Sequence, residues 1–269
     1  MKKYYYIYIT LFLLLSSFSQ DTINRELKNK AFRKGEVLRY RLHYGWFTAG
    51  EGTVSVLPEL FNINNKPCYR MEIDGKSKGA FAAMYKVDDH WRPYIDTATL
   101  IPQKFFRDIK EGGSYAINET MFYHHEEGKL NVQFQKNNKD PKTTEYEVPK
   151  NVHDIVSGFY YFRNLDYSKM KKGSEAVIDA FLEDKLYRFG VRYEGKEKIK
   201  TEFGKVNALK LVPIMPDNEL FEGENSITMW LSDDENKIPL KVKAKMFVGA
   251  VEVELTSYSG LRHKLNLEK

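Results

Sequence analysis

Hydrophobic and polar residues alternate with a period of two along most of this chain. Within 38–44, leucine and tyrosine alternate with arginine and histidine, and the same pattern returns at 69–74 and 251–255. Alternation of this kind predicts strands that bury one face. Turn sequences such as Gly112-Gly113 separate these runs at short intervals. The pattern predicts a mainly β protein, an antiparallel meander whose curled sheets form a half-barrel or an open sandwich.

One segment, 152–164, follows a helical period instead. Its apolar residues fall on one stripe of a helix, and Asn151 is placed to cap the first turn. The stripe consists of Val152, Ile155, Val156 and Phe159. We expect this single central helix to bridge two halves, about 35–148 and 174–261, of one β-rich domain that covers 35–269.

The first residues have the pattern of an export signal. Lys2 and Lys3 precede a short apolar run, and small residues at Ser17 and Ser19 suit a signal peptidase. We therefore predict a signal peptide over 1–19, followed by a polar lead-in over 20–34 that is frayed or forms a short helix. The apolar run is short for an uncleaved anchor, and no later segment is long enough to cross a membrane. The protein is expected to be exported, to the periplasm or to the extracellular space.

The cysteine content and the charge distribution exclude several classes of exported protein. Cys68 is the only cysteine, so neither an internal disulfide nor a lipidated cysteine at the cleavage point is expected. The fold must therefore depend on its hydrophobic core. The net charge of the full chain is +5, and two of the positive charges, Lys2 and Lys3, belong to the predicted signal peptide. The remaining positive and negative charges are interspersed along the chain. This distribution indicates a solvated surface without a nucleic-acid-binding stripe.

Two segments carry residues typical of serine hydrolases. In the helical segment, His153 and Ser157 are one turn apart, but the adjacent Asp154 cannot face the imidazole as a catalytic triad requires. We expect His153 and Ser157 to lie on the polar face of the helix. The stretch 75–79, Gly-Lys-Ser-Lys-Gly, matches a nucleophile elbow around Ser77, and Asp154 and His263 could complete the chain order. That fold needs a parallel sheet, so a hydrolase that uses Ser77 is only an alternative hypothesis.

Metal sites are not predicted. Ligand-type residues occur at 88–90, 124–127 and 233–235. Successive side chains of a strand point to opposite faces, so each group offers too few ligands on one side. No metal or cofactor is therefore expected.

The aromatic residues are more numerous than one inner face requires. Most are expected in the core, but some could line a concave apolar groove near the central helix. The candidate ligand-binding residues are Trp46, Phe81, Met84, Tyr85, Trp91 and Tyr160.

Several stretches resemble a family of exported bacterial proteins catalogued as domain of unknown function 3108. The stretch "GEVLRYRLHYGWFTAGEGTVSV" (35–56) is similar to the opening of that family, and "DIVSGFYYFRN" (154–164) to its central helix. The stretches "YEGKEKIKTEFGKVNALKL" (193–211) and "ITMWLSDDENKIPLKV" (227–242) resemble its later hairpins. The family implies no activity and no catalytic residues.

Two looser similarities concern the fold. Members of the family resemble a lipoprotein of capsule-export operons in their meandering β fold. The late hairpin resembles that of periplasmic lipoprotein carriers, whose half-barrels hold acyl chains. Both similarities imply an envelope protein with a concave β surface.

Together these patterns predict an exported, non-enzymatic protein of the cell envelope. It is expected to bind an apolar or glycan-linked ligand, such as a lipid or a glycan, or an envelope protein. A serine hydrolase and a purely structural envelope component are the alternatives.

Overall fold

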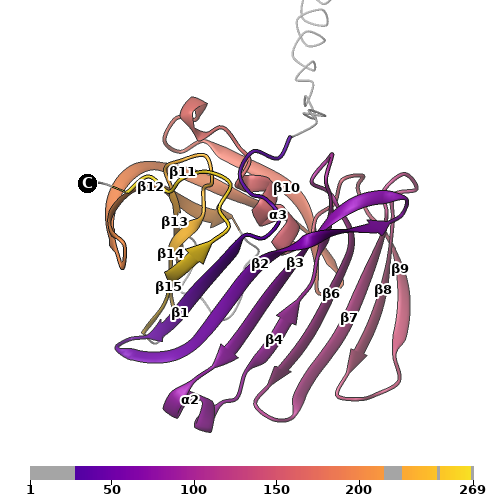
Figure 1. The fold of residues 1–269 in the computed structure, drawn as a ribbon. Coiled ribbons are helices and arrows are strands. Elements are labelled where there is room, and N and C mark those ends of the chain that lie inside the picture. Colours follow the sequence, from indigo (N-terminus) through magenta and orange to yellow (C-terminus); the bar gives the residue numbers. More distant parts are fainter. Residues whose placement is uncertain (1–27, 215–225, 247–248, 268–269) are drawn as a thin grey trace, which may run out of the picture.

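The computed structural model describes residues 28–214, 226–246 and 249–267. The predicted signal peptide, 1–19, lies outside these residues. The described chain forms one antiparallel sheet of 15 strands, which confirms the prediction of a mainly β, meandering fold (Figure 1). The strands are β1 (Val37–Tyr44), β2 (Phe47–Ile63), β3 (Lys66–Ser77), β4 (Asp88–Trp91), β5 (Tyr94–Asp96), β6 (Pro102–Glu111), β7 (Tyr115–His124), β8 (Lys129–Lys136), β9 (Lys142–Glu147), β10 (Glu175–Leu182), β11 (Lys185–Thr201), β12 (Gly204–Ile214), β13 (Ile227–Ser232), β14 (Pro239–Lys245) and β15 (Ala250–Ser259).

The sheet has a first arm, β1 to β9, and a second arm, β10 to β15, which join where β15 pairs with β1. The order runs β10 to β15 in sequence, then β1 to β4 and β6 to β9, while the short β5 pairs with β3 and β6. Strand β15 pairs with β1 over eight residues of each strand, so the last strand and the first strand are neighbours. The two outer strands of the sheet, β9 and β10, are therefore consecutive in sequence, and the central helix lies in the connection between them (Figure 1).

In the described part of the chain, two α-helices interrupt the strands. Helix α2 (Gly79–Met84) follows β3 at one end of the sheet, and α3 (Ile155–Phe162) connects the two arms. A short 3-10 helix (Tyr167–Lys169) comes before β10.

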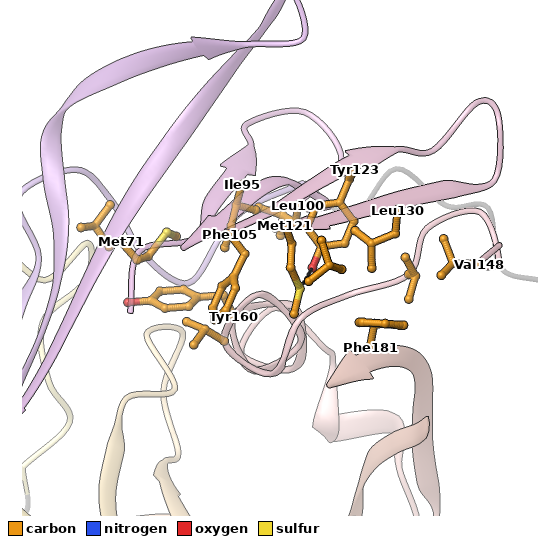
Figure 2. Packing of buried hydrophobic residues seen from close by; sticks show 14 of the residues in the cluster. Met71, Ile95, Leu100, Phe105, Met121, Tyr123, Leu130, Val148, Tyr160 and Phe181 are labelled. Carbon is orange, nitrogen blue, oxygen red and sulfur yellow. Dashed lines mark hydrogen bonds between the residues drawn. The ribbon is translucent and has the colours of Figure 1, made fainter. Parts of the chain in front are cut away.

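Helix α3 packs against the inner faces of both arms. On one side, Tyr160 joins a buried cluster with Met71, Phe105 and Phe181, which come from β3, β6 and β10 (Figure 2). On the other side, Phe162 joins a cluster built from β11, β12 and β13. A Cβ at Gly158 would come within 2.8 Å of Ile178 and 3.1 Å of Phe189, so glycine lets the helix approach β10 and β11 closely.

The helix begins later than the sequence pattern indicates. Asp154 is the N-cap, and its carboxylate accepts hydrogen bonds from the backbone N–H groups of Val156 and Ser157. The prediction that Asn151 caps the helix is wrong, because Asn151 has a left-handed backbone, with φ at 68°. Between these residues the chain is extended, and His153 forms an isolated parallel bridge to Ala180 of β10.

His153 and Ser157 do not lie on a polar face. His153 is 2 % exposed and Ser157 is fully buried, so their predicted exposure is wrong. The hydroxyl of Ser157 lies 3.1 Å from His153 Nδ1 and also accepts a hydrogen bond from the backbone N–H of Asp154. These polar side chains thus close the first turn of a buried helix.

The described part of the lead-in, residues 28–34, is neither frayed nor helical. Phe32 is fully buried and makes edge-on ring contacts with Tyr69 and Tyr160. The side chain of Asn164 accepts hydrogen bonds from the backbone N–H groups of Lys30 and Ala31. One phenylalanine in a polar segment therefore anchors it to the core.

Among these described residues, no helix combines the length and apolar character needed to cross a membrane.

Candidate functional site

Exposed apolar side chains gather at one end of the sheet, the end at which α2 follows β3. Figure 1 shows α2 at this end. These side chains come from the β1–β2 turn, from α2 and the residue after it, and from the start of β7. We call this group the apolar end, and its members are Trp46, Phe47, Phe81, Met84, Tyr85 and Tyr115. The described residues expose nine large hydrophobic side chains, and six of them belong to this group.

The backbone around α2 holds this end in place. The N–H of Lys78 donates to the carbonyl of Ala49 in β2, and the N–H of Ser77 donates to the carbonyl of Val87. Gly79 then takes a left-handed conformation, with φ at 57°, that starts the short helix. None of the residues of α2 is buried, so the helix presents its apolar side chains to solvent.

The side chains of the apolar end contact one another in pairs. Trp46 stacks on Phe47 with ring centroids 3.7 Å apart, and Phe81 meets Tyr85 edge-on at 6.4 Å. The Tyr85 hydroxyl donates to Glu111, 3.1 Å away. Even so, Trp46 is 84 % exposed and Met84 is 87 % exposed. The surface is therefore ordered but uncovered.

Two lysines lie beside this end. Lys78 pairs with Glu51 at 2.5 Å, and Lys136 lies 4.9 Å from the centre of the Tyr115 ring. The side chain of Lys78 remains about half exposed. Aromatic and basic side chains are thus interleaved here.

The structure separates the six residues predicted to bind a ligand. Phe81, Met84 and Tyr85 lie together in and beside α2, and Trp46 lies in the β1–β2 turn at the same end of the sheet. Tyr160 is 1 % exposed in the core, and Trp91 packs against the same core cluster. The six residues therefore do not line one groove beside α3, because Tyr160 and Trp91 pack in the hydrophobic core.

Sequence reasoning did not identify Phe47 and Tyr115 as members of this surface. Both flank tight turns, at 44–47 and 111–115, where a strand ends before it can bury its aromatic residue. Their position beside turn glycines was the available signal in the sequence.

The residues of the hydrolase hypothesis have partners in different parts of the fold. The Ser77 hydroxyl accepts a hydrogen bond from the backbone N–H of Val87. Asp154 caps α3, and His263 Nε2 lies 2.8 Å from the carbonyl of Lys30. Ser77 adjoins α2, at the opposite end of the strands from α3 (Figure 1). The structure does not bring these three side chains together.

The metal-type residues take part in other contacts. His90 bonds with Asp74 at 2.5 Å, and Asp88 lies 3.3 Å from its other ring nitrogen. Within 28–214, 226–246 and 249–267, no three histidine, cysteine or acidic side chains are grouped closely enough to hold a metal ion.

Similarity to solved structures concerns the fold. The chain matches the crystal structure of a beta-barrel-like protein of domain of unknown function DUF1849 from Brucella abortus, with a TM-score of 0.55 and 10 % identity over 86 % of this chain and 99 % of that one. A candidate exported protein with a YmcC-like fold from Bacteroides fragilis matches with a TM-score of 0.35 and 7 % identity, covering 85 % and 97 % of the two chains. A candidate lipoprotein from Parabacteroides distasonis matches with a TM-score of 0.33 and 12 % identity, with the same coverage.

Family membership follows from the sequence itself. No curated protein matches this chain. The family model described as "Protein of unknown function (DUF3108)" matches residues 39–256, which include every strand from β2 to β14. The chain belongs to this family.

Proposed function

We propose that this is an exported, non-enzymatic protein of the cell envelope that attaches to a membrane surface through its apolar end. One observation carries the proposal: six of the nine exposed large hydrophobic side chains of the described residues gather at one end of the sheet. A concentration of exposed apolar side chains is expensive in water and marks a binding surface.

The residue types and their placement favour a lipid interface as the partner. Tryptophan and tyrosine prefer the boundary between headgroups and acyl chains, where an apolar ring and a polar edge are both satisfied. Trp46 and Met84 project from a turn and a short helix, as side chains that enter an interface must. The neighbouring lysines suit anionic lipid headgroups. A small ligand would instead need a concave site that covers most of its surface.

The opposite end of the first arm carries a group of polar side chains. There a hollow of about 310 Å³ is lined by Asn64, Gln103, Glu126 and Glu127, among others. A protein with one apolar end and one polar end has a preferred orientation at a membrane.

Export is the part of the proposal that rests on the N-terminal sequence. The basic start, the short apolar run and Ser19 are typical of a cleaved signal. We place the mature protein in the periplasm, where its apolar end would meet a membrane leaflet; secretion from the cell is the alternative.

Vesicle flotation tests the attachment. The protein, purified without detergent, should float with vesicles of phosphatidylethanolamine and phosphatidylglycerol. Replacing Trp46 and Met84 by serine should weaken partitioning about tenfold or more, because each buried side chain of this size contributes roughly 1.5–3 kcal/mol. The control is Leu186→Ser, since Leu186 is 46 % exposed away from the apolar end.

Two results would reject the attachment. One is the absence of flotation with these vesicles, which would favour a purely structural envelope component. The other is an equal loss of partitioning in the Leu186→Ser control, which would indicate nonspecific adsorption.

The non-enzymatic part of the proposal needs its own test. Ser77 should not react with a fluorophosphonate probe, because its hydroxyl is engaged by the N–H of Val87 and the histidine of the hydrolase hypothesis has its partners elsewhere. Stoichiometric labelling that disappears in Ser77→Ala would replace this proposal by the hydrolase.

A further inference from the structure

A second candidate site lies on the outer face of the first arm. A hollow of about 330 Å³ opens over β3, β4, β5 and β6. Met71 and Ile73 of β3 point into the core, so the residues that alternate with them point to the opposite face. The hollow is lined by Arg70, His90, Arg92, Tyr94, Lys104, Phe106 and Asp108.

Arg92 lines this hollow, and several hydrogen bonds fix its guanidinium. Its guanidinium donates to the carbonyls of Ile73 and Trp91 at 3.0 Å and to Asp74 at 2.6 Å. Glu72 lies 3.4 Å from its Nε atom. Burial by itself would raise the pKa of Asp74, but hydrogen bonds from His90 and Arg92 outweigh burial and lower it. Asp74 therefore stays ionised and holds the side chains of His90 and Arg92 in place.

Arg70 and Lys104 supply donors that the described residues leave unused. One terminal nitrogen of Arg70 pairs with Glu72 at 2.8 Å, but its Nε atom is buried without a hydrogen-bond partner. Lys104 lies over the rings of Tyr94, at 6.0 Å, and Phe122, at 5.0 Å. Within the described chain, no carboxylate pairs with Lys104. The Arg70 side chain is 27 % exposed and lines the same hollow as Lys104, so both place positive charge where a ligand carboxylate can reach it.

The rest of the lining offers other chemistry. Tyr94 and Phe106 present aromatic rings, on which a flat apolar surface can stack. Asp108 donates no hydrogen bond and accepts one from Lys110 at 2.9 Å, which leaves acceptor capacity for a hydroxyl group. The hollow thus combines an unpaired Lys104, the partly exposed Arg70, two aromatic faces and a hydroxyl acceptor.

We propose that this hollow binds an acidic saccharide unit. The carboxylate of the sugar would lie between Arg70 and Lys104, its C–H face on Tyr94 or Phe106, and a hydroxyl would donate to Asp108. A simple phosphate would leave the two rings without a stacking partner and would bring no sugar hydroxyl for Asp108 to accept. A neutral sugar would leave Lys104 without a counter-charge. The proposal is independent of the membrane attachment, since none of these residues belongs to the apolar end.

Calorimetric titration of the whole mature protein tests this site. The probes are a trimer of galacturonic acid, a neutral trimer of galactose and inorganic phosphate. We expect the acidic trimer to bind, and to bind at least about tenfold more tightly than the other two, as charge-paired contacts predict. Added salt should weaken the binding.

Three substitutions assign the contacts. Lys104→Gln and Arg70→Gln should each weaken binding about tenfold, the loss expected for one charge-assisted hydrogen bond. Lys86→Gln is the matched control, because Lys86 lies beyond β3 outside the hollow and should leave binding unchanged. Thermal unfolding of each variant shows whether Arg70→Gln acts through stability; Lys104 forms no ion pair with the described residues, so its variant keeps the test valid.

Each possible failure has one meaning. Equal binding of the neutral trimer would show that the cations do not recognise the ligand. Equal binding of phosphate would reduce the hollow to a general anion site. No binding of the acidic trimer, or equal losses in Lys104→Gln and Lys86→Gln, would overturn the proposal outright.

Discussion

Arg163 joins three distant segments through one buried ion pair. Its guanidinium donates to both carboxylate oxygens of Glu36, at 2.6 and 2.9 Å, and to the carbonyl of Asn236. Arg163 ends α3, Glu36 precedes β1, and Asn236 lies between β13 and β14. All three residues come from the stretches that carry the family resemblance. In this chain, those stretches meet at the point where α3 attaches to the sheet.

Removing Arg163 should therefore be strongly destabilising. Arg163→Met leaves the buried Glu36 carboxylate without its partner, which should cost about 3–5 kcal/mol of unfolding free energy. Urea unfolding measures the loss. The matched control is Arg41→Met, because the Arg41–Glu202 pair is about 40 % exposed and should be worth less than about 1 kcal/mol.

A double variant separates charge from packing. In Arg163→Met with Glu36→Leu, no charge remains buried, so much of the lost stability should return. A double variant as unstable as Arg163→Met would show that shape and the Asn236 contact, not the uncompensated charge, are responsible.

His153 predicts how stability depends on pH. Burial lowers the pKa of His153 to about 3 in the folded protein, from an ordinary value of 6.5. The unfolded chain takes up this proton as the pH falls through 6.5, whereas the folded protein does not, so stability is lost between pH 6.5 and 3. At pH 4.5 the loss should be about 2 kcal/mol relative to pH 7. In His153→Gln this part of the pH dependence should disappear.

Asp154 acts in the opposite direction and must be separated from His153. Burial raises the pKa of Asp154 to about 6, despite hydrogen bonds from Ser157 and Val156 that lower it. Its contribution is present at low pH and is lost as the pH rises from about 4 to 6. Asp154→Asn keeps an oxygen for the cap and removes the titration. The comparison is therefore between Asp154→Asn and the double variant Asp154→Asn with His153→Gln. If both lost equal stability between pH 7 and pH 4.5, His153 would not be the source of the pH dependence.

At the scale of elements, the sequence identifies α3 but not its cap. The apolar stripe of 152–164 predicts a helix, and a helix is there. The first residues of the stripe instead extend along β10, because the bridge from His153 to Ala180 competes with another helical turn. Such competition depends on a strand 27 residues away in sequence. No local pattern could reveal it.

The rival caps can be compared directly. Asp154→Ala should destabilise the protein by about 1–2 kcal/mol, because two backbone N–H groups lose their acceptor. Asn151→Gly should change stability little, since glycine keeps the left-handed backbone and only a side chain without a capping role is lost. Urea midpoints of the two variants decide between them, and a larger loss in Asn151→Gly would restore the original assignment.

The candidate surfaces show the same limit of local reasoning. The sequence draws attention to Trp46, Phe81, Met84 and Tyr85 because aromatic and apolar residues stand out there. It cannot distinguish them from Tyr160, which has the same character and is buried. Exposure depends on which strands end beside the turn and on what α3 covers. The donors of Arg70 and Lys104 were missed for a similar reason, since β3 and β6 come close only in the folded sheet, where both pair with β4 and β5.

On the scale of the whole molecule, two arms form one sheet. Alternation and turns predict the strands, but the pairing of β15 with β1 joins the two ends of the chain and has no local signature. Val54 of β2 packs against core clusters of both arms, and Phe159 of α3 does so as well. The arms therefore share side chains as well as backbone hydrogen bonds.

This sharing predicts a single cooperative unfolding transition. The chain has three tryptophans, of which Trp91 packs in the first arm and Trp230 in the second, where its indole N–H donates to Glu197. In a Trp46→Phe background, variants that keep only Trp91 or only Trp230 report on one arm each. Their fluorescence transitions in urea should coincide, because a folded arm alone would expose the faces that α3 and β1 cover. A tryptophan that responds at a clearly lower urea concentration than the other would show that the arms unfold separately, as independent halves would.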